Sequence, residues 1–484
     1  MRRSSIGRQG GWLAAVLLLG AATLRGEDWP RFRGPNGAGV ADGAALPGEL
    51  LPAKNALWKI ALPPGYSSPV IFGDRIYLTA FEGDALLTLC LRRSDGSTLW
   101  RREAPRARKE SLDDRNGPAS PSPAADAAGV VVFFADFGLL AYDHDGRERW
   151  RAPLGPFGNV YGMGASPILV EDVVILVCDQ GVGSFIAAFD AATGRERWRT
   201  ARPEAVSGHS TPIVRPRSSS PGPLEVLAPG SFRLGAYDPK TGELLWWADG
   251  LPSEMKSGPL LGEGNVLVVG YSSPANEPGK QVVLPPFEEW RTSRDTDGDG
   301  RVGKGEADDT TREMFQFVDL DHDGFISAAE WRMNQASALA ENGLLALRFG
   351  SQGPLGPDGL LWKHQRSVPQ LPTPVLYRGI VYMINDGGIL TTLDARTGAA
   401  LKQGRLREAI DRYYASPVAG DGKVFLASRT GLVSVLRAGP EQEVLSVTDL
   451  DDEIAATPAL ADGRVYLRTR GALSCFGSAA GAIR

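Results

Sequence analysis

Eight copies of one sequence unit restrict the possible folds of this chain more than any other feature. Each copy starts with a Ser-Pro, Thr-Pro or Gly-Pro step and continues through two apolar runs to an Asp, a tight turn and, in most copies, a Trp. The steps between successive opening prolines are 54, 44, 45, 47, 115, 43 and 41 residues. A period in the forties with four short strands is typical of propeller blades, because one twisted sheet buries both faces only when neighbours stack on it. The opening prolines are Pro69, Pro123, Pro167, Pro212, Pro259, Pro374, Pro417 and Pro458.

The pattern therefore predicts an all-β, eight-bladed β-propeller. The eighth unit stops after three strands, and a spare strand lies around Trp58, so we expect the N- and C-terminal strands to pair and remove an open sheet edge. Leu401 and Leu445 are expected to replace the Trp in the sixth and seventh units. The alternative, two β-sandwiches, fits eight even repeats poorly. The tryptophans expected to pack between adjacent blades are Trp100, Trp150, Trp198, Trp246 and Trp362.

The first 22 residues have the features of a secretory signal peptide. Three arginines precede an apolar run from Trp12 to Ala22, which is too short to span a bilayer. No cysteine near the cleavage region could carry a lipid anchor, and no later run is apolar enough for a transmembrane helix. We therefore expect a periplasmic or secreted protein with residues 1–22 as signal peptide, 23–274 as the first propeller part, 275–342 as an insertion and 343–484 as the second propeller part.

Charge and cysteine usage exclude some classes of function. The formal net charge is −5, and it becomes −8 without the signal peptide and its three arginines, so nucleic acid is not an expected partner. The three cysteines, Cys90, Cys178 and Cys475, lie far apart in apolar surroundings and are expected to be packing residues.

The 115-residue step contains two segments with the spacing of EF-hand calcium loops. One runs from Asp295 to Glu306 and the other from Asp319 to Glu330. In such loops, oxygens at positions 1, 3 and 5, a backbone carbonyl at position 7 and a bidentate Glu at position 12 surround a hard cation, while Gly at position 6 permits the turn. The predicted ligands are Asp295, Asp297, Asp299, Arg301 and Glu306 in the first loop, and Asp319, Asp321, Asp323, Phe325, Ser327 and Glu330 in the second.

We therefore predict two Ca²⁺ sites on a small helical EF-hand pair inserted between the second and third strands of blade five. Position 9 is Gly303 in the first loop, where water is expected to complete the shell, and Ser327 in the second. Val302 and Ile326 should join the loops as a β-bridge. Helices are expected before, between and after the loops, with Met314, Phe315 and Val318 on one side of the middle helix. The alternative is two solvated acidic loops without metal.

The insertion is also the most acidic part of the chain. Residues 287–334 hold 13 acidic and 6 basic residues, a charge of −7. Calcium would relieve this repulsion, so we expect it to fold or stiffen the insertion while the propeller stays folded without it. We expect the insertion to cap one rim, on the face shared with the connection RREAPRARKESLDDRNG, which we expect to be a solvated loop.

The repeats resemble those of pyrroloquinoline-quinone-type propellers, on motifs such as AATGRERW and PKTGELLWW from Trp29 to Phe476. Such repeats occur in quinoprotein dehydrogenases and in the lipoprotein of the bacterial outer-membrane β-barrel assembly machinery. The opening DWPRFRGPNGAG is similar to the start of secreted bacterial proteins with these repeats. The blade serves many functions, so the resemblance implies the fold rather than an activity.

The features that would make the chain an enzyme are missing from its sequence. The dehydrogenases carry a vicinal cysteine pair against their quinone, whereas no two cysteines here are adjacent, and there is no haem-attachment or nucleophile-elbow motif. His209 could face the central channel, but packing or hydrogen bonding is the expected role. We therefore expect a monomeric, non-catalytic scaffold that binds calcium and an unidentified protein or glycan partner, without pyrroloquinoline quinone. The alternatives are a quinone-dependent dehydrogenase of unusual type and a dockerin-like docking module.

Overall fold

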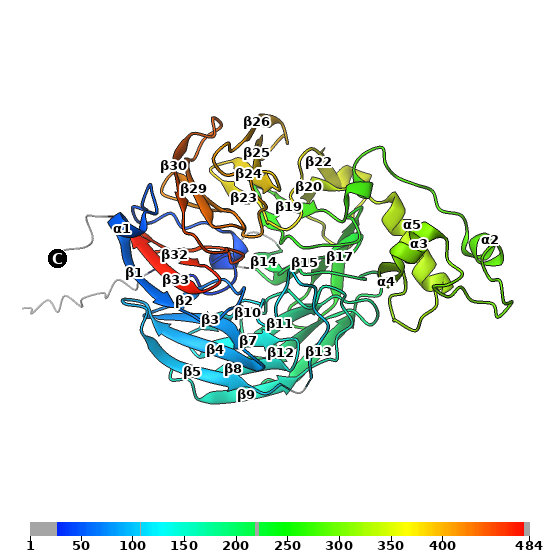
Figure 1. Ribbon diagram of the computed structural model, residues 1–484, viewed down its shortest axis with the longest axis horizontal. Helices are drawn as coiled ribbons and strands as arrows, with labels where there is room; N and C mark the ends of the chain where they lie inside the picture. The colour runs from blue at the N-terminus through cyan, green and yellow to red at the C-terminus, as the bar shows by residue number, and fades with distance from the viewer. Residues whose placement is uncertain (1–26, 107, 218–221, 479–484) are drawn as a thin grey trace, which may run out of the picture.

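The computed structural model describes residues 27–478 apart from 107 and 218–221, and it shows eight β-sheets arranged around a central axis (Figure 1). The predicted signal peptide lies outside the described residues. Within each sheet the strands follow one another from the axis outward, as in an up-and-down blade. The eight-bladed propeller is therefore confirmed. Each opening proline lies directly before the innermost strand of its blade.

The blades have the following strands. Blades one and two contain β2 (Val70–Phe72), β3 (Arg75–Glu82), β4 (Ala85–Arg92), β5 (Thr98–Ala104), β6 (Ala124–Asp126), β7 (Gly129–Phe134), β8 (Gly138–Tyr142) and β9 (Glu148–Pro153). Blades three and four contain β10 (Ile168–Val170), β11 (Val173–Cys178), β12 (Phe185–Asp190), β13 (Glu196–Ala201), β14 (Ile213–Pro216), β15 (Leu224–Gly230), β16 (Arg233–Tyr237) and β17 (Leu244–Asp249).

Blades five and six contain β18 (Leu260–Leu261), β19 (Asn265–Gly270), β20 (Gly343–Arg348), β22 (Leu360–His364), β23 (Val375–Tyr377), β24 (Ile380–Asn385), β25 (Ile389–Asp394) and β26 (Ala400–Arg405). Blades seven and eight contain β27 (Val418–Gly420), β28 (Lys423–Ala427), β29 (Leu432–Arg437), β30 (Val444–Asp449), β31 (Ala459–Ala461), β32 (Arg464–Arg468), β33 (Ala472–Gly477) and β1 (Ala56–Ala61). Blade four gains a short fifth strand, β21 (Gly353–Pro354), which runs parallel to β17 and has no counterpart in the sequence pattern.

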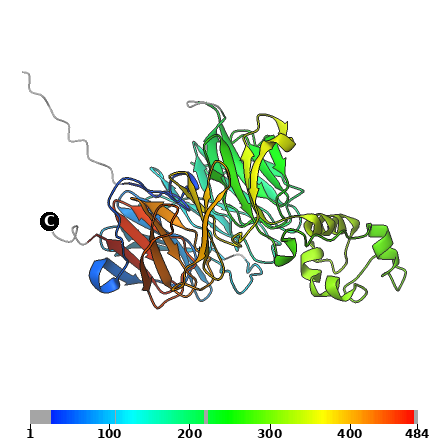
Figure 2. The ribbon, with the colours of Figure 1, turned by 90° about the horizontal axis from the view of Figure 1, so that it is seen from above.

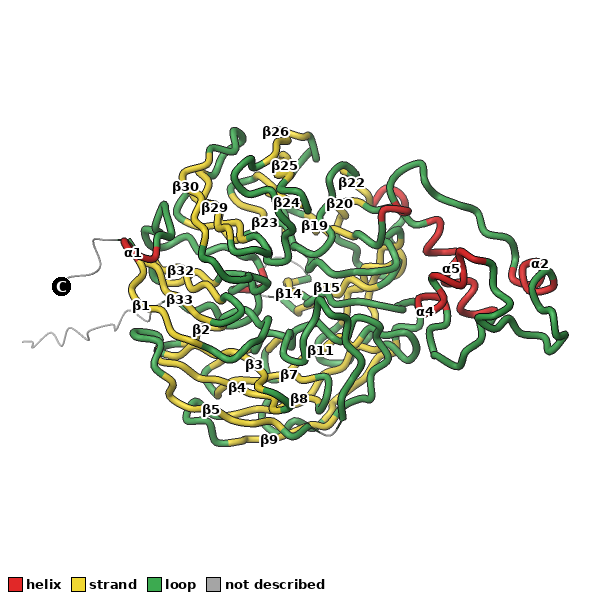
Figure 3. Tube along the Cα trace, viewed as in Figure 1, coloured by secondary structure: helices red, strands yellow, loops and turns green. Residues whose placement is uncertain are grey.

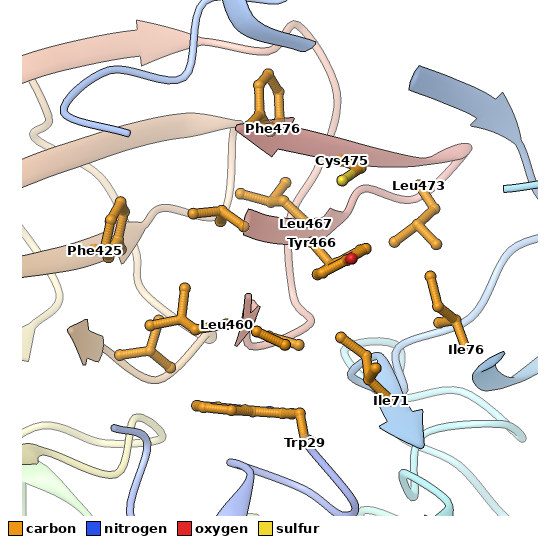
Figure 4. Close-up of a cluster of buried hydrophobic side chains, with 14 of the residues drawn as sticks. Trp29, Ile71, Ile76, Phe425, Leu460, Tyr466, Leu467, Leu473, Cys475 and Phe476 are labelled. Carbon is orange, nitrogen blue, oxygen red and sulfur yellow. The ribbon is translucent and has the colours of Figure 1, made fainter. Parts of the chain in front are cut away.

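The ring closes through its two ends, as predicted. Strand β1 pairs antiparallel with β33, and Trp58 lies opposite Cys475. A hydrophobic cluster joins blades one, seven and eight across this closure, and Trp29 from the N-terminal segment packs into it near Ile71 and Leu460 (Figure 4). All three cysteines are buried in strands and unpaired, which confirms their packing role.

The repeated tryptophans pack between blades because each ring lies on a glycine of the next blade's turn. A Cβ atom added at Gly194 would lie 2.4 Å from the ring of Trp150, and the indole N–H of Trp150 donates to the carbonyl of Ala191 at 2.9 Å. Trp100 and Trp198 repeat this arrangement, with indole donors at the same distance from the carbonyls of His144 and Pro239. The tight turn therefore needs Gly both for its positive φ and for the space the indole occupies.

The prediction for the sixth and seventh units was wrong by one residue. Strand register places Lys402 and Ser446, and not Leu401 and Leu445, at the position of the tryptophans. Lys402 keeps part of the indole's role, because its ammonium donates to the carbonyl of Glu441 in the next blade at 2.6 Å. Leu401 is 43% exposed. The apolar character of the leucines suggested the wrong residue, since only the pairing register fixes which side chain faces the neighbouring blade.

The residue before each opening proline links its blade to the next. The hydroxyl of Ser122, for example, accepts the backbone N–H of Ser68 at 2.8 Å. The hydroxyl of Ser68 in turn accepts the backbone N–H of Thr457, in the last blade, at 3.0 Å. The chain of bonds is interrupted only at Gly258, which has no hydroxyl. The linked residues form a ring around the channel, hereafter the hydroxyl ring: Ser68, Ser122, Ser166, Thr211, Thr373, Ser416 and Thr457.

The N-terminal segment closes one end of the channel. Trp29 forms an antiparallel β-bridge with Ile71 of blade one. The buried guanidinium of Arg31 donates to the carbonyl of Pro212 at 2.6 Å. Arg33 donates to the carbonyls of Thr373, Pro374 and Pro417 at 3.1, 2.8 and 3.0 Å. One segment with the short helix η1 (Pro35–Gly37) thus ties together blades one, four, six and seven. The other end of the channel remains as a pocket.

The long insertion leaves blade five between β19 and β20, where the sequence placed it, and consists of short helices joined by loops (Figure 3). Its helices are α2 (Phe287–Thr292), α3 (Asp309–Glu313), α4 (Phe315–Val318) and α5 (Ala328–Leu339), preceded by η2 (Pro274–Asn276). The remaining helical turns are α1 (Pro52–Asn55) and η3 (Pro357–Gly359). The middle helix breaks at Met314, which is 48% exposed and does not share a buried side with Phe315 and Val318.

The insertion projects sideways from the propeller edge and does not cap the rim (Figures 1 and 2). It nevertheless contacts the blades at several points. The ring of Phe317 lies 5.9 Å from that of Tyr161, and the hydroxyl of Ser337 donates to that of Ser253 at 2.8 Å. A Cβ at Gly181 would lie 2.1 Å from the carbonyl oxygen of Leu320, so blade three and the second acidic loop are in close contact.

Candidate functional site

The two acidic loops of the insertion share several backbone hydrogen bonds. In the first, the carboxylates of Asp295, Asp297 and Asp299 bring ligand atoms within 4.8 Å of one another. The N–H of Gly300, at position 6, donates to Asp295 at 2.9 Å, and Gly300 has a φ of +86°. The sharp turn predicted for this glycine is therefore present, and it aims three carboxylates at one point.

The second loop repeats these features. Asp319, Asp321 and Asp323 converge within the same 4.8 Å, and Gly324 has a φ of +91° and donates to Asp319 at 3.1 Å. The Oδ1 atom of Asp319 is buried and has no hydrogen-bond partner among the described residues. Burial raises the pKa of the Asp319 carboxyl. An orphaned carboxylate oxygen at the first ligand position fits a loop built to coordinate a cation.

The two glutamates at position 12 lie across their loops. Glu306 accepts the backbone N–H groups of Thr296 and Gly303 at 2.8 and 2.9 Å, and Glu330 accepts those of Leu320 and Ser327 at 2.7 and 2.8 Å. These backbone hydrogen bonds lower the pKa of Glu306. Ser327 acts as the N-cap of α5, where its hydroxyl accepts the N–H of Glu330.

The loops are joined to each other side by side. Gly303 and Phe325 form the β-bridge, and the N–H of Ile326 donates to the carbonyl of Val302 at 3.0 Å, close to the predicted pairing. The guanidinium of Arg301 lies 3.5 Å from the ring centre of Phe325, so the two position-7 side chains also stack across the loops. Beneath them, Trp290 and Trp331 stack at 3.9 Å, a contact that the sequence pattern did not reveal.

A second candidate site is a pocket of about 250 Å³ at the open end of the channel. Its floor is the hydroxyl ring with Phe32 from the N-terminal segment. Each blade contributes one residue to its wall. This residue lies two positions before the blade's member of the hydroxyl ring, and in blade five it lies two positions before Gly258. Because alternate residues of an extended chain face the same way, both layers point into the channel. The eight wall residues are Tyr66, Ser120, Gly164, His209, Lys256, Leu371, Tyr414 and Ala455.

Two ion pairs lie beside this wall. Arg115 contacts Asp113 through two nitrogens at 2.6 and 2.8 Å, and the Arg115 guanidinium lowers the pKa of Asp113 to about 2. Lys256 donates to Glu254 at 2.5 Å, and Glu254 also accepts a hydrogen bond from the hydroxyl of Tyr161 at 3.1 Å. The cations of the pocket are therefore already paired with carboxylates.

His209 is a half-buried polar residue of the wall. Its Nε2 atom has no hydrogen-bond partner among the described residues, so the hydrogen bonding expected for this residue is not found there. Burial, with a smaller contribution from Lys256, lowers the pKa of His209 to about 3. The imidazole is therefore neutral at pH 7, when it can either donate or accept a hydrogen bond.

Sequence reasoning did not identify this pocket, although its signal was present in the repeats. The wall position is uniform in register but varied in residue type, from glycine to tyrosine, whereas the floor position is Ser or Thr in seven of eight blades. The connection from 101 to 117 was predicted to be a solvated loop, but part of it contacts the propeller and lines the pocket. It is held down by Arg106, which donates to buried Asp136 at 2.7 Å, and it brings Asp113, Arg115 and Asn116 to the pocket.

The blades and their repeats define a β-propeller of the pyrroloquinoline-quinone-like class. The family model described as outer membrane protein assembly factor BamB matches residues 84–281 and 183–484, and the chain belongs to this family. The comparison with curated proteins gave no match.

Solved structures of several proteins share the fold at low sequence identity. BamB from Moraxella catarrhalis is 14% identical, with 88% of this chain and 99% of that chain covered and a TM-score of 0.54. A europium-containing methanol dehydrogenase is 10% identical over 93% and 98% of the chains, with a TM-score of 0.59. The quinohemoprotein alcohol dehydrogenase from Comamonas testosteroni is 14% identical over 94% and 81%, also at 0.59. These likenesses show the fold alone.

The residues of the channel pocket do not fit pyrroloquinoline quinone, which carries three carboxylates. Arg115 and Lys256 are both paired with acidic side chains, so the described residues that line the pocket offer no uncompensated cation for these carboxylates. Among the described residues, the groups of three acidic side chains that could hold a metal ion are both in the insertion and not in the channel.

Within the same residues, no helix has the length and apolar character needed to cross a membrane.

Proposed function

We propose that this chain is an exported, non-catalytic propeller scaffold that binds two calcium ions through the insertion and uses its channel-mouth face to bind a partner. One observation carries the calcium part: two loops with matching hydrogen bonds each direct three carboxylates at one point, and in the second loop a buried oxygen of Asp319 is left without a partner. Calcium prefers six to eight oxygen ligands, including a bidentate Glu, and both loops supply that set.

The partner-binding part is supported by the arrangement around the channel. The insertion, the connection from 101 to 117 and the varied wall residues all meet at the same face, through Tyr161 and Arg115. Loops on a rigid scaffold are the usual place for recognition. The family model that matches this chain is described as outer membrane protein assembly factor BamB, and assembly is a role that a non-catalytic propeller can serve.

The decisive experiment is a calorimetric titration of the metal-stripped mature protein with Ca²⁺. We expect two ions to bind to the parent protein and none to the double variant Glu306→Gln, Glu330→Gln, because each change removes a ligand oxygen charge from position 12. The matched control is Glu313→Gln, an exposed acid of α3 that is not a predicted ligand, and it should keep both sites. Unchanged stoichiometry in the double variant would contradict the proposal.

The absence of quinone chemistry needs its own test. Pyrroloquinoline quinone added to the calcium-loaded protein should cause no absorbance shift and no saturable heat. Binding with a spectral change would instead favour a quinone-dependent dehydrogenase.

A further inference from the structure

We propose that the channel-mouth pocket binds a neutral, polyhydroxylated ligand the size of one sugar residue. This inference deepens the proposed function by naming a ligand class for the partner-binding face, and it can fail while calcium binding stands. Four features of the pocket support it: compensated charge, preformed aromatic walls, unused hydrogen-bonding capacity and size.

The charges of the pocket favour an uncharged ligand. The two cations and two carboxylates form the pairs Arg115–Asp113 and Lys256–Glu254. An anionic ligand would have to displace a carboxylate from its cation, and a cationic ligand would have to displace the cation. The Lys256–Glu254 pair is largely buried, so leaving one of its members without a partner is costly, and a neutral molecule is the ligand that keeps both pairs intact.

The aromatic walls are held in place before any ligand arrives. A Cβ at Gly117 would lie 2.7 Å from the ring of Tyr66, and a Cβ at Gly164 would lie 3.1 Å from His209, so each ring rests on a glycine. Tyr161 is fixed by an edge-to-face contact with His209, with ring centres 5.9 Å apart, and by its hydrogen bond to Glu254. Rigid aromatic faces bind the C–H faces of a flat or ring-shaped ligand at little entropic cost.

The hydrogen-bonding groups suit hydroxyls in particular. The Nε2 atom of neutral His209 is buried beside the pocket without a partner among the described residues, and its imidazole can donate or accept. The hydroxyl ring below and the phenols of Tyr66 and Tyr414 have the same dual character. A ligand hydroxyl is also both donor and acceptor, so it can pair with each of these groups without leaving one unsatisfied.

Size limits the ligand to something small. The pocket measures about 250 Å³, slightly below the roughly 300–1,000 Å³ of sites for drug-sized ligands. One pyranose ring is the polyhydroxylated unit of this scale, either as a free sugar or as the end of a glycan chain.

The test is calorimetry and saturation-transfer NMR on the calcium-loaded mature protein. The probes are glucose, galactose and N-acetylglucosamine, the methyl glycosides of each, and citrate as an anion. We expect at least one neutral sugar or glycoside to bind saturably and citrate not to bind. A tenfold or greater preference for glycosides over free sugars identifies the end of a glycan as the source, and the reverse preference identifies a free sugar.

Variants place the binding in the pocket. Tyr414→Ala and His209→Gln should weaken sugar binding at least tenfold, whereas Tyr271→Ala and His364→Gln, which change the same residue types outside the pocket, should not. Tyr414→Phe keeps the ring and removes only the hydroxyl, so it serves as a second test if Tyr414→Ala unfolds. The proposal is wrong if no sugar binds, if only citrate binds, or if folded pocket variants bind as tightly as the parent.

Discussion

Burial sets the protonation state of His209, and stability should depend on pH as a result. The pKa of this histidine is about 3 in the folded protein, because burial and the nearby Lys256 disfavour the imidazolium, against about 6.5 for an unfolded chain. Above pH 6.5 neither state carries the proton. As the pH falls from 6.5 towards 3, only the unfolded chain binds it, so the folded state loses stability over that window.

His209→Gln should remove this contribution. The variant is expected to lose less unfolding free energy than the parent between pH 7 and pH 4.5, because glutamine does not titrate. Urea denaturation at the two pH values measures the difference. Parallel losses in parent and variant would mean that His209 is protonated in the folded protein or exposed.

The blade turn is the element in which sequence, packing and stability are most closely linked. Gly194 has a φ of +72° and lies directly under Trp150, while Gly379 has a φ of +77° with no atom within 4 Å of a Cβ built on it. The two glycines therefore separate the cost of backbone strain from the cost of a clash.

Gly379→Ala should lower the unfolding free energy by about 1 kcal/mol through backbone strain alone. Gly194→Ala should lose a further 1–3 kcal/mol, roughly the cost of overpacking, because the new methyl group displaces the indole. Urea unfolding followed by tryptophan fluorescence measures both variants. Equal losses would show that the indole is not held by the turn.

The elements that were predicted from sequence are those that carry their signal locally. The blades repeat every forty-odd residues, and the acidic loops have fixed spacing, so both could be located residue by residue. Lys402 was missed because a blade's lateral contact depends on strand register, which an apolar neighbour such as Leu401 obscures. The pocket was missed because each blade contributes one wall residue, and no contiguous motif links Tyr66 to His209 and Tyr414.

At the scale of the whole molecule, the insertion and the channel mouth are in contact through one aromatic pair. Phe317 lies two residues before Asp319, the first predicted ligand of the second loop, and its ring packs against Tyr161 of the pocket. Calcium that orders this loop should therefore also order the rim. With a charge of −7 on residues 287–334, we expect the insertion to be the part most dependent on the proposed ion.

Chelation should raise hydrogen exchange in residues 287–334 and in the rim segments 108–117 and 158–165, while the blade strands stay protected. Phe317→Ala should raise exchange in the rim segments even with calcium bound, because the contact is gone. Met314→Ala, at the exposed break between α3 and α4, is the matched control and should behave as the parent. Rim exchange that ignores both calcium and Phe317 would show that the two parts are independent.

The N-terminal segment also determines when the chain can finish folding. Arg33 is synthesised hundreds of residues before Pro417, whose carbonyl it binds, and β1 must wait for β33, which ends at Gly477. The segment that holds Arg33 and β1 is thus among the last to reach its native contacts, and seven finished blades still leave an incomplete ring. Chains truncated at residue 455 should remain sensitive to protease along their whole length, whereas the full chain becomes resistant in one step.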